Sequence, residues 1–258
     1  MRAVFVALLS LLLLCAAACG GAQKTGSYAE DARLDYEKAM VAFDEQDCLV
    51  AEPLFKKIRA NYPYTRYAAL SELREADCLS IQDKHAEAIE IYQRFSKVHA
   101  SHESVPYARF RAAESQYMQI PSEWFLSPPA YERDLRAARD ALKDLRRFLL
   151  DFPYDDKYQE AVKMERRTLE LLAKHELYVA DFYLEREHPE AAIVRLESML
   201  ATYEGSGYEP QALLLMGRTQ LMLKDRTSAH ATFRELMARY PKSGSAAQAE
   251  RFLVETGG

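Results

Sequence analysis

One hydrophobic pattern recurs five times along this chain, and its spacing is that of a helix face. Each copy begins with an alanine and places bulky apolar side chains four and seven residues later, so the three positions lie on one face of an α-helix. The small alanine allows a neighbouring helix to approach closely. A position that closes the helical segment stands 12 residues after each alanine. The alanines are Ala51, Ala88, Ala141, Ala192 and Ala229, and the closing positions are Pro63, Ala100, Pro153, Glu204 and Pro241.

The spacing between these copies sets the size of the repeat. Consecutive alanines lie 37, 53, 51 and 37 residues apart, which predicts an all-α array of about five helical hairpins with two longer members. A short capping helix is predicted at about residues 243–255. Such arrays form extended binding surfaces and seldom catalytic pockets. The apolar positions are Phe55, Tyr92, Leu145, Leu196 and Phe233 at the fourth residue, and Ile58, Phe95, Phe148, Met199 and Leu236 at the seventh.

Glycine and proline usage supports helices joined by short turns. No glycine occurs between Ser27 and Glu204, whereas a sheet protein of this length needs many turn glycines. Most of the 10 prolines fall at repeat ends or in one loop, where they stop helices without breaking them. Asp47 is the predicted N-cap of the second helix, and Thr65 is predicted to open the third. Helices are predicted over residues 28–45, 47–61, 132–151 and 156–187. Pro189 is predicted to begin the helix that follows residues 156–187.

The first residues are predicted to be a targeting segment outside the fold. Arg2 precedes an apolar run that is too short to span a bilayer, and small residues follow directly before Cys19. This is the form of a lipoprotein signal over residues 1–18, after which Cys19 becomes the lipidated first residue; a plain secretion signal cut nearby is the alternative. Residues 19–27 form a flexible tether, since they are small and polar. Acyl chains would anchor the protein at the periplasmic face of an outer membrane.

Two further cysteines, Cys48 and Cys78, lie almost symmetrically about the turn at residues 62–64. Positions at equal distance from the turn of an antiparallel helix pair come together, so a disulfide is predicted in an oxidising compartment. Two buried thiols are the alternative, and a pair of cysteines alone does not indicate zinc.

The segment 120–131 interrupts the third repeat. It holds three prolines, the only tryptophan and Phe125. Such an apolar segment cannot be helical and is predicted to pack as a lid over the groove, the alternative being a contact with a partner.

The register of small residue, aromatic residue and terminal proline resembles the tetratricopeptide repeat, with Ala180 and Gly217 at its close-packing position. Most of the chain is also similar to the BamD family of outer-membrane lipoproteins. The segment 172–200 carries this resemblance best, supported by the stretches 62–68 and 132–134. In that segment the family pattern is represented by Val179, Ala180, Tyr183, Arg186 and Arg195.

The resemblance implies an α-solenoid of tetratricopeptide-like hairpins that acts as a scaffold and client-recognition subunit in the insertion and folding of outer-membrane β-barrel proteins. Residues 154–258 are expected to dock on periplasmic domains of the central barrel subunit, a BamA-like protein. Arg195 would pair with an acidic residue of that partner, beside Arg186 and Glu197. Alternatively, Arg195 is a surface arginine paired with Glu197 or Glu190.

The resemblance also implies that residues 28–153 recognise unfolded barrel proteins through an extended peptide. The first helices of such arrays face the concave side, so their side chains are expected to line the peptide groove. The candidates are Tyr64, Tyr67, Arg74, Tyr107 and Arg111, although tyrosines of helical repeats are more often packing residues.

Composition argues against several other functions. The net charge of −5 comes from interspersed charges without a basic block, so nucleic acid is not indicated. The sequence contains no phosphate-binding glycine loop or triad-like arrangement, so neither an enzyme nor a cofactor is predicted, and His99 with His102 does not suggest a metal site. The alternative function is a tetratricopeptide lipoprotein that acts as a secretin or pilus pilot or coordinates envelope synthesis. An enzyme such as a peptidoglycan hydrolase is the least favoured hypothesis.

Overall fold

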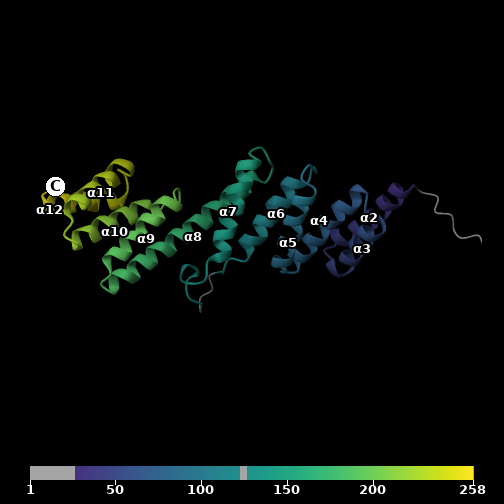
Figure 1. Cartoon of the computed structure of the whole chain (residues 1–258), viewed down its shortest axis with the longest axis horizontal. Helices are drawn as coiled ribbons and strands as arrows, with labels where there is room; N and C mark the ends of the chain where they lie inside the picture. Colours follow the sequence, from purple (N-terminus) through teal and green to yellow (C-terminus); the bar gives the residue numbers. More distant parts are fainter. Residues whose placement is uncertain (1–26, 123–126, 258) are drawn as a thin grey trace, which may run out of the picture. The chain divides into compact units, whose positions relative to one another are not determined.

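The computed structural model describes residues 27–122 and 127–257. The predicted signal segment, Cys19 and the tether before Ser27 lie outside this part, as do Trp124 and Phe125 of the predicted lid. The regular elements of the described part are all helical, which confirms the predicted fold class (Figure 1). They are α2 (Tyr28–Asp44), α3 (Cys48–Asn61), α4 (Arg66–Ile81), α5 (His85–Val98), α6 (Val105–Met118), the short 3₁₀ helix η1 (Ala130–Glu132), α7 (Arg136–Asp151), α8 (Tyr158–Glu185), α9 (Pro189–Thr202), α10 (Glu209–Met222), α11 (Arg226–Arg239) and α12 (Gly244–Thr256).

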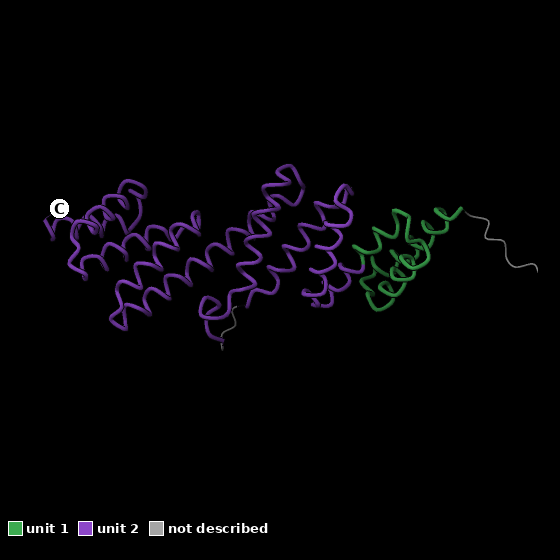
Figure 2. Tube along the Cα trace, viewed as in Figure 1, with its two compact units in different colours: residues 1–74 green, residues 75–258 purple. Residues whose placement is uncertain are grey.

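Two compact units divide the chain, unit 1 with residues 1–74 and unit 2 with residues 75–258 (Figure 2). The division falls inside α4, whereas the limit predicted between the two binding regions lies between α7 and α8. Those two helices share one hydrophobic core, so they belong to the same compact unit. The separate roles assigned to the two regions stay a prediction about binding.

Unit 1 contains the first hairpin, formed by α2 and α3. Asp47 caps α3 as predicted, because its carboxylate accepts a hydrogen bond of 3.2 Å from the backbone N–H of Val50. The hydroxyl of Thr65 accepts from the N–H of Ala68 at 3.3 Å, directly before α4. Both caps satisfy N–H groups that a helix leaves without partners at its start.

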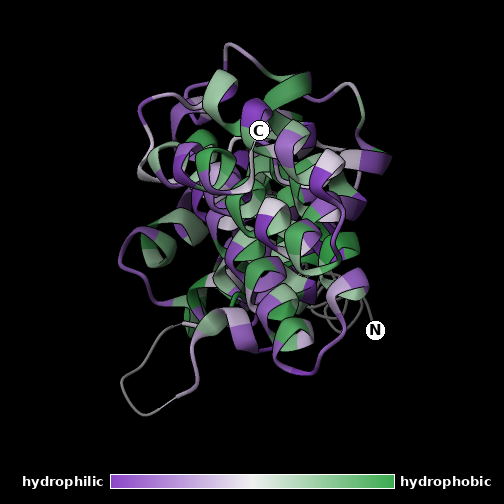
Figure 3. Cartoon of the chain, turned by 90° about the vertical axis from the view of Figure 1, so that its left-hand side faces the viewer, coloured by the Kyte–Doolittle hydropathy of each residue, from purple (hydrophilic) through white to green (hydrophobic). Residues whose placement is uncertain are grey.

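Unit 2 contains the remaining hairpins, in which each helix from α5 to α12 packs against the next. The predicted long helix is α8, with 28 residues. Its N-terminal half contributes Ala161 and Met164 to a cluster with α6 and α7, and its C-terminal half contributes Leu172 and Ala180 to a cluster that extends to α12. Hydrophobic and hydrophilic residues alternate in bands along single helices, as an amphipathic repeat requires (Figure 3).

The recurring pattern of alanine and two bulky residues is confirmed at every copy. All of its fifteen side chains are buried, and none exposes more than 2% of its surface. Each alanine lies in the second helix of its hairpin, and that helix ends ten residues later. The ends are Asn61, Val98, Asp151, Thr202 and Arg239.

An aromatic residue follows each of these helix ends, a regularity that the sequence analysis did not identify. The backbone N–H of this residue donates to the carbonyl of the second bulky position, four residues earlier. The bond satisfies one of the carbonyls that a helix leaves open at its end. The capping residues are Tyr62, His99, Phe152, Tyr203 and Tyr240.

In the described part of the chain, four turns between paired helices contain a left-handed residue that is not glycine. These residues stand five positions before the repeat alanine and have φ between 59° and 63°. A left-handed L-residue costs about 1–2 kcal/mol, so the packing of the two helices imposes this conformation. They are Gln46, Asp83, Glu187 and Lys224.

The start of the helix predicted over residues 132–151 was wrong. The segment first forms η1, and α7 begins only at Arg136. Leu135 is buried at the N-cap, while the carboxylate of Asp134 accepts from the backbone N–H of Arg136 at 2.9 Å. This local bond holds the chain in a turn and delays the helix by four residues.

Candidate partner-binding surfaces

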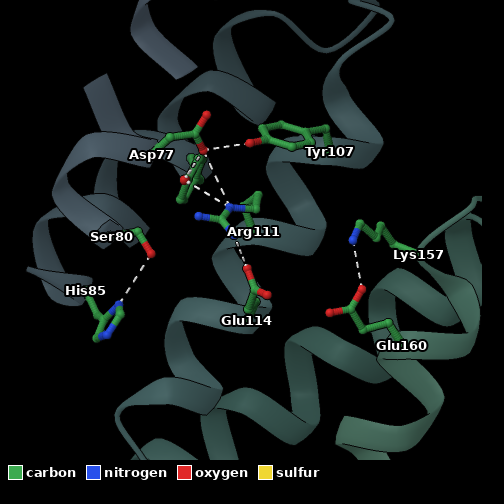
Figure 4. Close-up of polar contacts among 9 residues, drawn as sticks. Asp77, Ser80, His85, Tyr107, Arg111, Glu114, Lys157 and Glu160 are labelled. Atoms are coloured by element: carbon green, nitrogen blue, oxygen red, sulfur yellow. Dashed lines mark hydrogen bonds and ion pairs between the residues drawn. The ribbon is translucent and has the colours of Figure 1, made fainter. Parts of the chain in front are cut away.

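A buried polar network connects α4, α5 and α6 in unit 2 (Figure 4). Its centre is the carboxylate of Asp77, whose Oδ1 accepts hydrogen bonds from the hydroxyls of Tyr92 at 2.5 Å and Tyr107 at 2.7 Å. Nε of Arg111 lies 3.5 Å from the same oxygen, and its other end forms an ion pair with Glu114. One carboxylate therefore holds three helices together.

Burial and charge shift the pKa values within this network. Burial, and then the negative charge of Asp77, raise the pKa of Tyr92. Burial alone would lower the pKa of Arg111, but Tyr92, Glu114 and Asp77 outweigh it and raise the pKa. Tyr107 and Arg111 thus place their polar groups inside the unit, so their role in the predicted groove rests on the exposed parts of these side chains.

The other three groove candidates lie in unit 1. Tyr64 follows α3 and exposes 94% of its surface. Tyr67 is half-buried and packs against Tyr36 with ring centroids 5.5 Å apart. The guanidinium of Arg74 lies 5.3 Å from the ring centroid of Phe43. Because the five candidates are divided between two units, a shared groove stays a prediction.

The docking candidate Arg195 lies on α9 and forms a contact with α8. Its Nη1 is 3.5 Å from Oε2 of Glu176, and the Arg195 side chain is 44% exposed against 9% for Glu176. The pairing with Glu197 or Glu190 that the sequence left open is absent from the ion pairs of the described residues. Glu197 is exposed on the same helix. Arg195 is therefore a half-exposed cation held by a buried carboxylate.

Arg186 is the C-cap of α8 and forms an exposed cation–aromatic pair. Its guanidinium lies 3.4 Å from the ring centroid of Phe182, and its Nη1 donates to the carbonyl of that residue at 3.2 Å. Phe182 is 40% exposed. One turn earlier on α8, the exposed ring of Tyr178 packs against Tyr131 of η1 at 5.7 Å. Nδ1 of His175 is 2.6 Å from the carbonyl oxygen of Tyr131, which attaches η1 to α8.

A cleft of about 310 Å³, lined mostly by polar and charged residues, lies among α5, α6 and α7. Asp151 at the end of α7 pairs with both Arg109 and Arg147 of its lining, at 3.3 Å and 2.7 Å. Burial raises the pKa of Asp144, and the charge of Lys143 opposes this shift. The sequence analysis missed this cleft, because its lining residues come from three helices without a shared sequence motif.

Cys48 and Cys78 are both buried. No disulfide joins cysteines in the described part of the chain. The two residues belong to different units, so their pairing in an oxidising compartment stays a prediction. Among residues 27–122 and 127–257, no three His, Cys, Asp or Glu side chains are grouped as a metal site. Length and hydropathy do not qualify any helix of these ranges as a membrane span.

The described residues form an all-α repeat protein built from helical hairpins. The chain belongs to the YfiO family, described as outer membrane lipoprotein, which matches residues 29–230. This match confirms the resemblance to the BamD family.

Relatives and solved structures show how far the similarity extends. Outer membrane protein assembly factor BamD of Xylella fastidiosa is 26% identical over 210 residues, which cover 80% of this chain and 71% of the relative. The protein of the same name from Neisseria gonorrhoeae is 24% identical over 241 residues, covering 91% and 90%. Among solved structures, MamA from Desulfovibrio magneticus RS-1 matches 84% of this chain and all of its own, with 14% identity and a TM-score of 0.39.

Proposed function

We propose that this chain is an outer membrane protein assembly factor that acts by binding and has no catalytic step. The observation that carries the proposal is the family match over residues 29–230, together with hairpins whose repeat positions are buried throughout. Relatives that cover most of the chain have this function in their names. The protein would serve as a scaffold and client-recognition subunit in the insertion and folding of β-barrel proteins.

The site of action in this proposal is the periplasmic face of the outer membrane. Cys19 would carry the lipid, and the residues up to Ser27 would tether the folded part. The family description, outer membrane lipoprotein, supports this anchor. Mass spectrometry of the N-terminal peptide tests it, since lipidation at Cys19 adds acyl mass and a plain secretion signal does not.

Arg195, Arg186 and Glu197 would form the docking surface for the central barrel subunit. The half-exposed guanidinium of Arg195 supports this role, because an arginine that is free on one side can bind a carboxylate with two parallel hydrogen bonds. The exposed Arg186–Phe182 pair provides a second contact on the same hairpin. Arginine and aromatic residues are enriched among the side chains that dominate binding energy.

Client recognition would use the exposed aromatic ring of Tyr64 with Tyr67, Arg74, Tyr107 and Arg111. Aromatic side chains contribute affinity for extended apolar peptides through buried contact area. The exposure of Tyr64 supports this role most directly. Its ring is 94% exposed, so it contributes little to packing within the described structure and is accessible to a peptide.

The test is affinity purification from native membranes with a tagged chain that replaces the native one. Arg195→Glu is compared with Arg166→Glu, a matched control on α8 whose arginine is exposed and pairs with Glu170 of its own helix. We expect Arg195→Glu to lose most of the barrel subunit while the control recovers as much as the wild type. Equal recovery by both variants contradicts the docking role. Recovery of a secretin in place of the barrel subunit would establish the pilot function.

A further inference from the structure

Glu176 is a buried carboxylate that the fold satisfies only in part. It lies on α8 among the buried side chains of Leu172, Ala173 and Ala180, and its own side chain is 9% exposed. Its Oε2 accepts no hydrogen bond from the described residues, although Nη1 of Arg195 lies 3.5 Å from it. The only ion pair of this carboxylate in that part of the chain is the 3.5 Å contact with Arg195.

Stability does not account for such a group. Removing a carboxylate from water has a large free-energy cost, and a single 3.5 Å ion pair without a hydrogen bond compensates for it incompletely. Neutral replacements of buried charged pairs are often as stable as the original or more so.

Arg195 shows what the buried charge does. A guanidinium has five N–H donors in a rigid plane, and Nη1 of Arg195 is in contact with Glu176. The Arg195 side chain is 44% exposed, so part of the guanidinium is accessible to a partner. A guanidinium held on one edge by a buried carboxylate has fewer orientations than a free one, so less entropy is lost when the other edge binds a partner.

We propose that Glu176 is the positioning residue for docking through Arg195: it orients the guanidinium so that its free edge receives an acidic side chain of the partner. This inference rests on the proposed docking role of Arg195. It assigns to α8 a residue that does not touch the partner and acts on affinity through α9.

The test measures dissociation constants with the purified periplasmic region of the barrel subunit from the same organism, by calorimetry, alongside the melting temperature of each variant. We expect Glu176→Gln to weaken binding about two- to tenfold, since one long side chain becomes free to rotate. Its melting temperature is expected to equal or exceed that of the wild type. Glu176→Asp, which keeps the charge, restores part of the affinity. In the background of Arg195→Glu, the Gln substitution has no further effect.

Glu170→Gln on α8 is the matched control, because its carboxylate pairs on the surface with Arg166, and we expect its affinity to be unchanged. Unchanged binding by Glu176→Gln, while Arg195→Glu binds weakly, overturns the positioning role alone. Weak binding by Glu176→Gln together with a lower melting temperature also overturns it, because the residue would then act through the fold. Full binding by Arg195→Glu contradicts the proposed docking function itself.

Discussion

Gly217 on α10 is the position where one added methyl group should disturb the core most. A Cβ built on this residue would lie 2.3 Å from Cε1 of Phe233, 2.7 Å from Cδ1 and 2.8 Å from Cζ. Real Cβ contacts do not occur at such distances, and Phe233 is fully buried on α11. Gly217→Ala therefore requires the two helices to separate or the ring to leave its preferred rotamer.

The size of the effect follows from two opposing contributions. Overpacking a well-filled core costs about 1–3 kcal/mol, and the short contact to a buried ring places this case near 3 kcal/mol. Alanine is more favourable than glycine inside a helix by about 1 kcal/mol. The net loss is about 2 kcal/mol, which lowers the melting temperature of a unit of this size by about 4–8 °C.

Thermal unfolding followed by circular dichroism measures this loss. Gly244→Ala is the matched control, since Gly244 begins α12 and has no atom within 4 Å of a built Cβ, so the variant should be as stable as the wild type or more so. Combining Gly217→Ala with Phe233→Leu should cost less than the sum of the two changes, because the smaller side chain makes room for the methyl group. If Gly217→Ala has the same melting temperature as Gly244→Ala, the fold does not depend on the close packing of α10 against α11 at this position.

Three further predictions concern other parts of the fold. Lys224→Gly should stabilise the protein by about 0.5–1 kcal/mol, because glycine adopts the left-handed conformation at φ 63° without strain. Part of this gain is lost because glycine makes the unfolded chain more flexible. A lower midpoint of denaturation would contradict this prediction. Asp77→Ala should cost about 3–5 kcal/mol and Tyr107→Phe about 1 kcal/mol in urea unfolding, and equal costs would show that the network is not centred on the carboxylate. Burial raises the pKa of Asp144 above 3.8, so the folded state binds this proton more tightly than the unfolded state and ionised Asp144 destabilises the fold. Asp144→Asn should therefore raise the melting temperature at pH 7, and the gain should vanish as the pH falls below 3.8; a gain that persists in acid would exclude ionisation as its cause.

Periodicity alone predicted the helices and much of the core, because it reports burial directly. Ala51, Phe55 and Ile58 illustrate this: their spacing fixed both the helix face and the helix end, and all three are buried. Caps such as Asp47 were predictable for a similar reason, since they depend on bonds to residues three positions away.

Features that depend on a second helix could not be predicted in this way. Asp77 and Glu176 read as ordinary polar positions on amphipathic helices, and their burial becomes visible only when Tyr92 or Arg195 approaches from a neighbouring helix. The late start of α7 has a local cause that competes with periodicity, because Asp134 bonds to the backbone in a turn. The sequence thus identified Arg195 but not the residue that it contacts.

The helices that carry the repeat alanine are nearly uniform in length, whereas their partners are not. Four of the five, α3, α5, α9 and α11, have 14 residues each, and α8 has 28. Fourteen residues make about 3.9 helical turns and about 21 Å, so doubling that length brings the buried stripe back to within about 40° of its starting direction. The second half of α8 therefore acts as a rigid spacer between two cores that rotates the buried stripe only slightly, and α8 is the place where homologous chains could vary that distance.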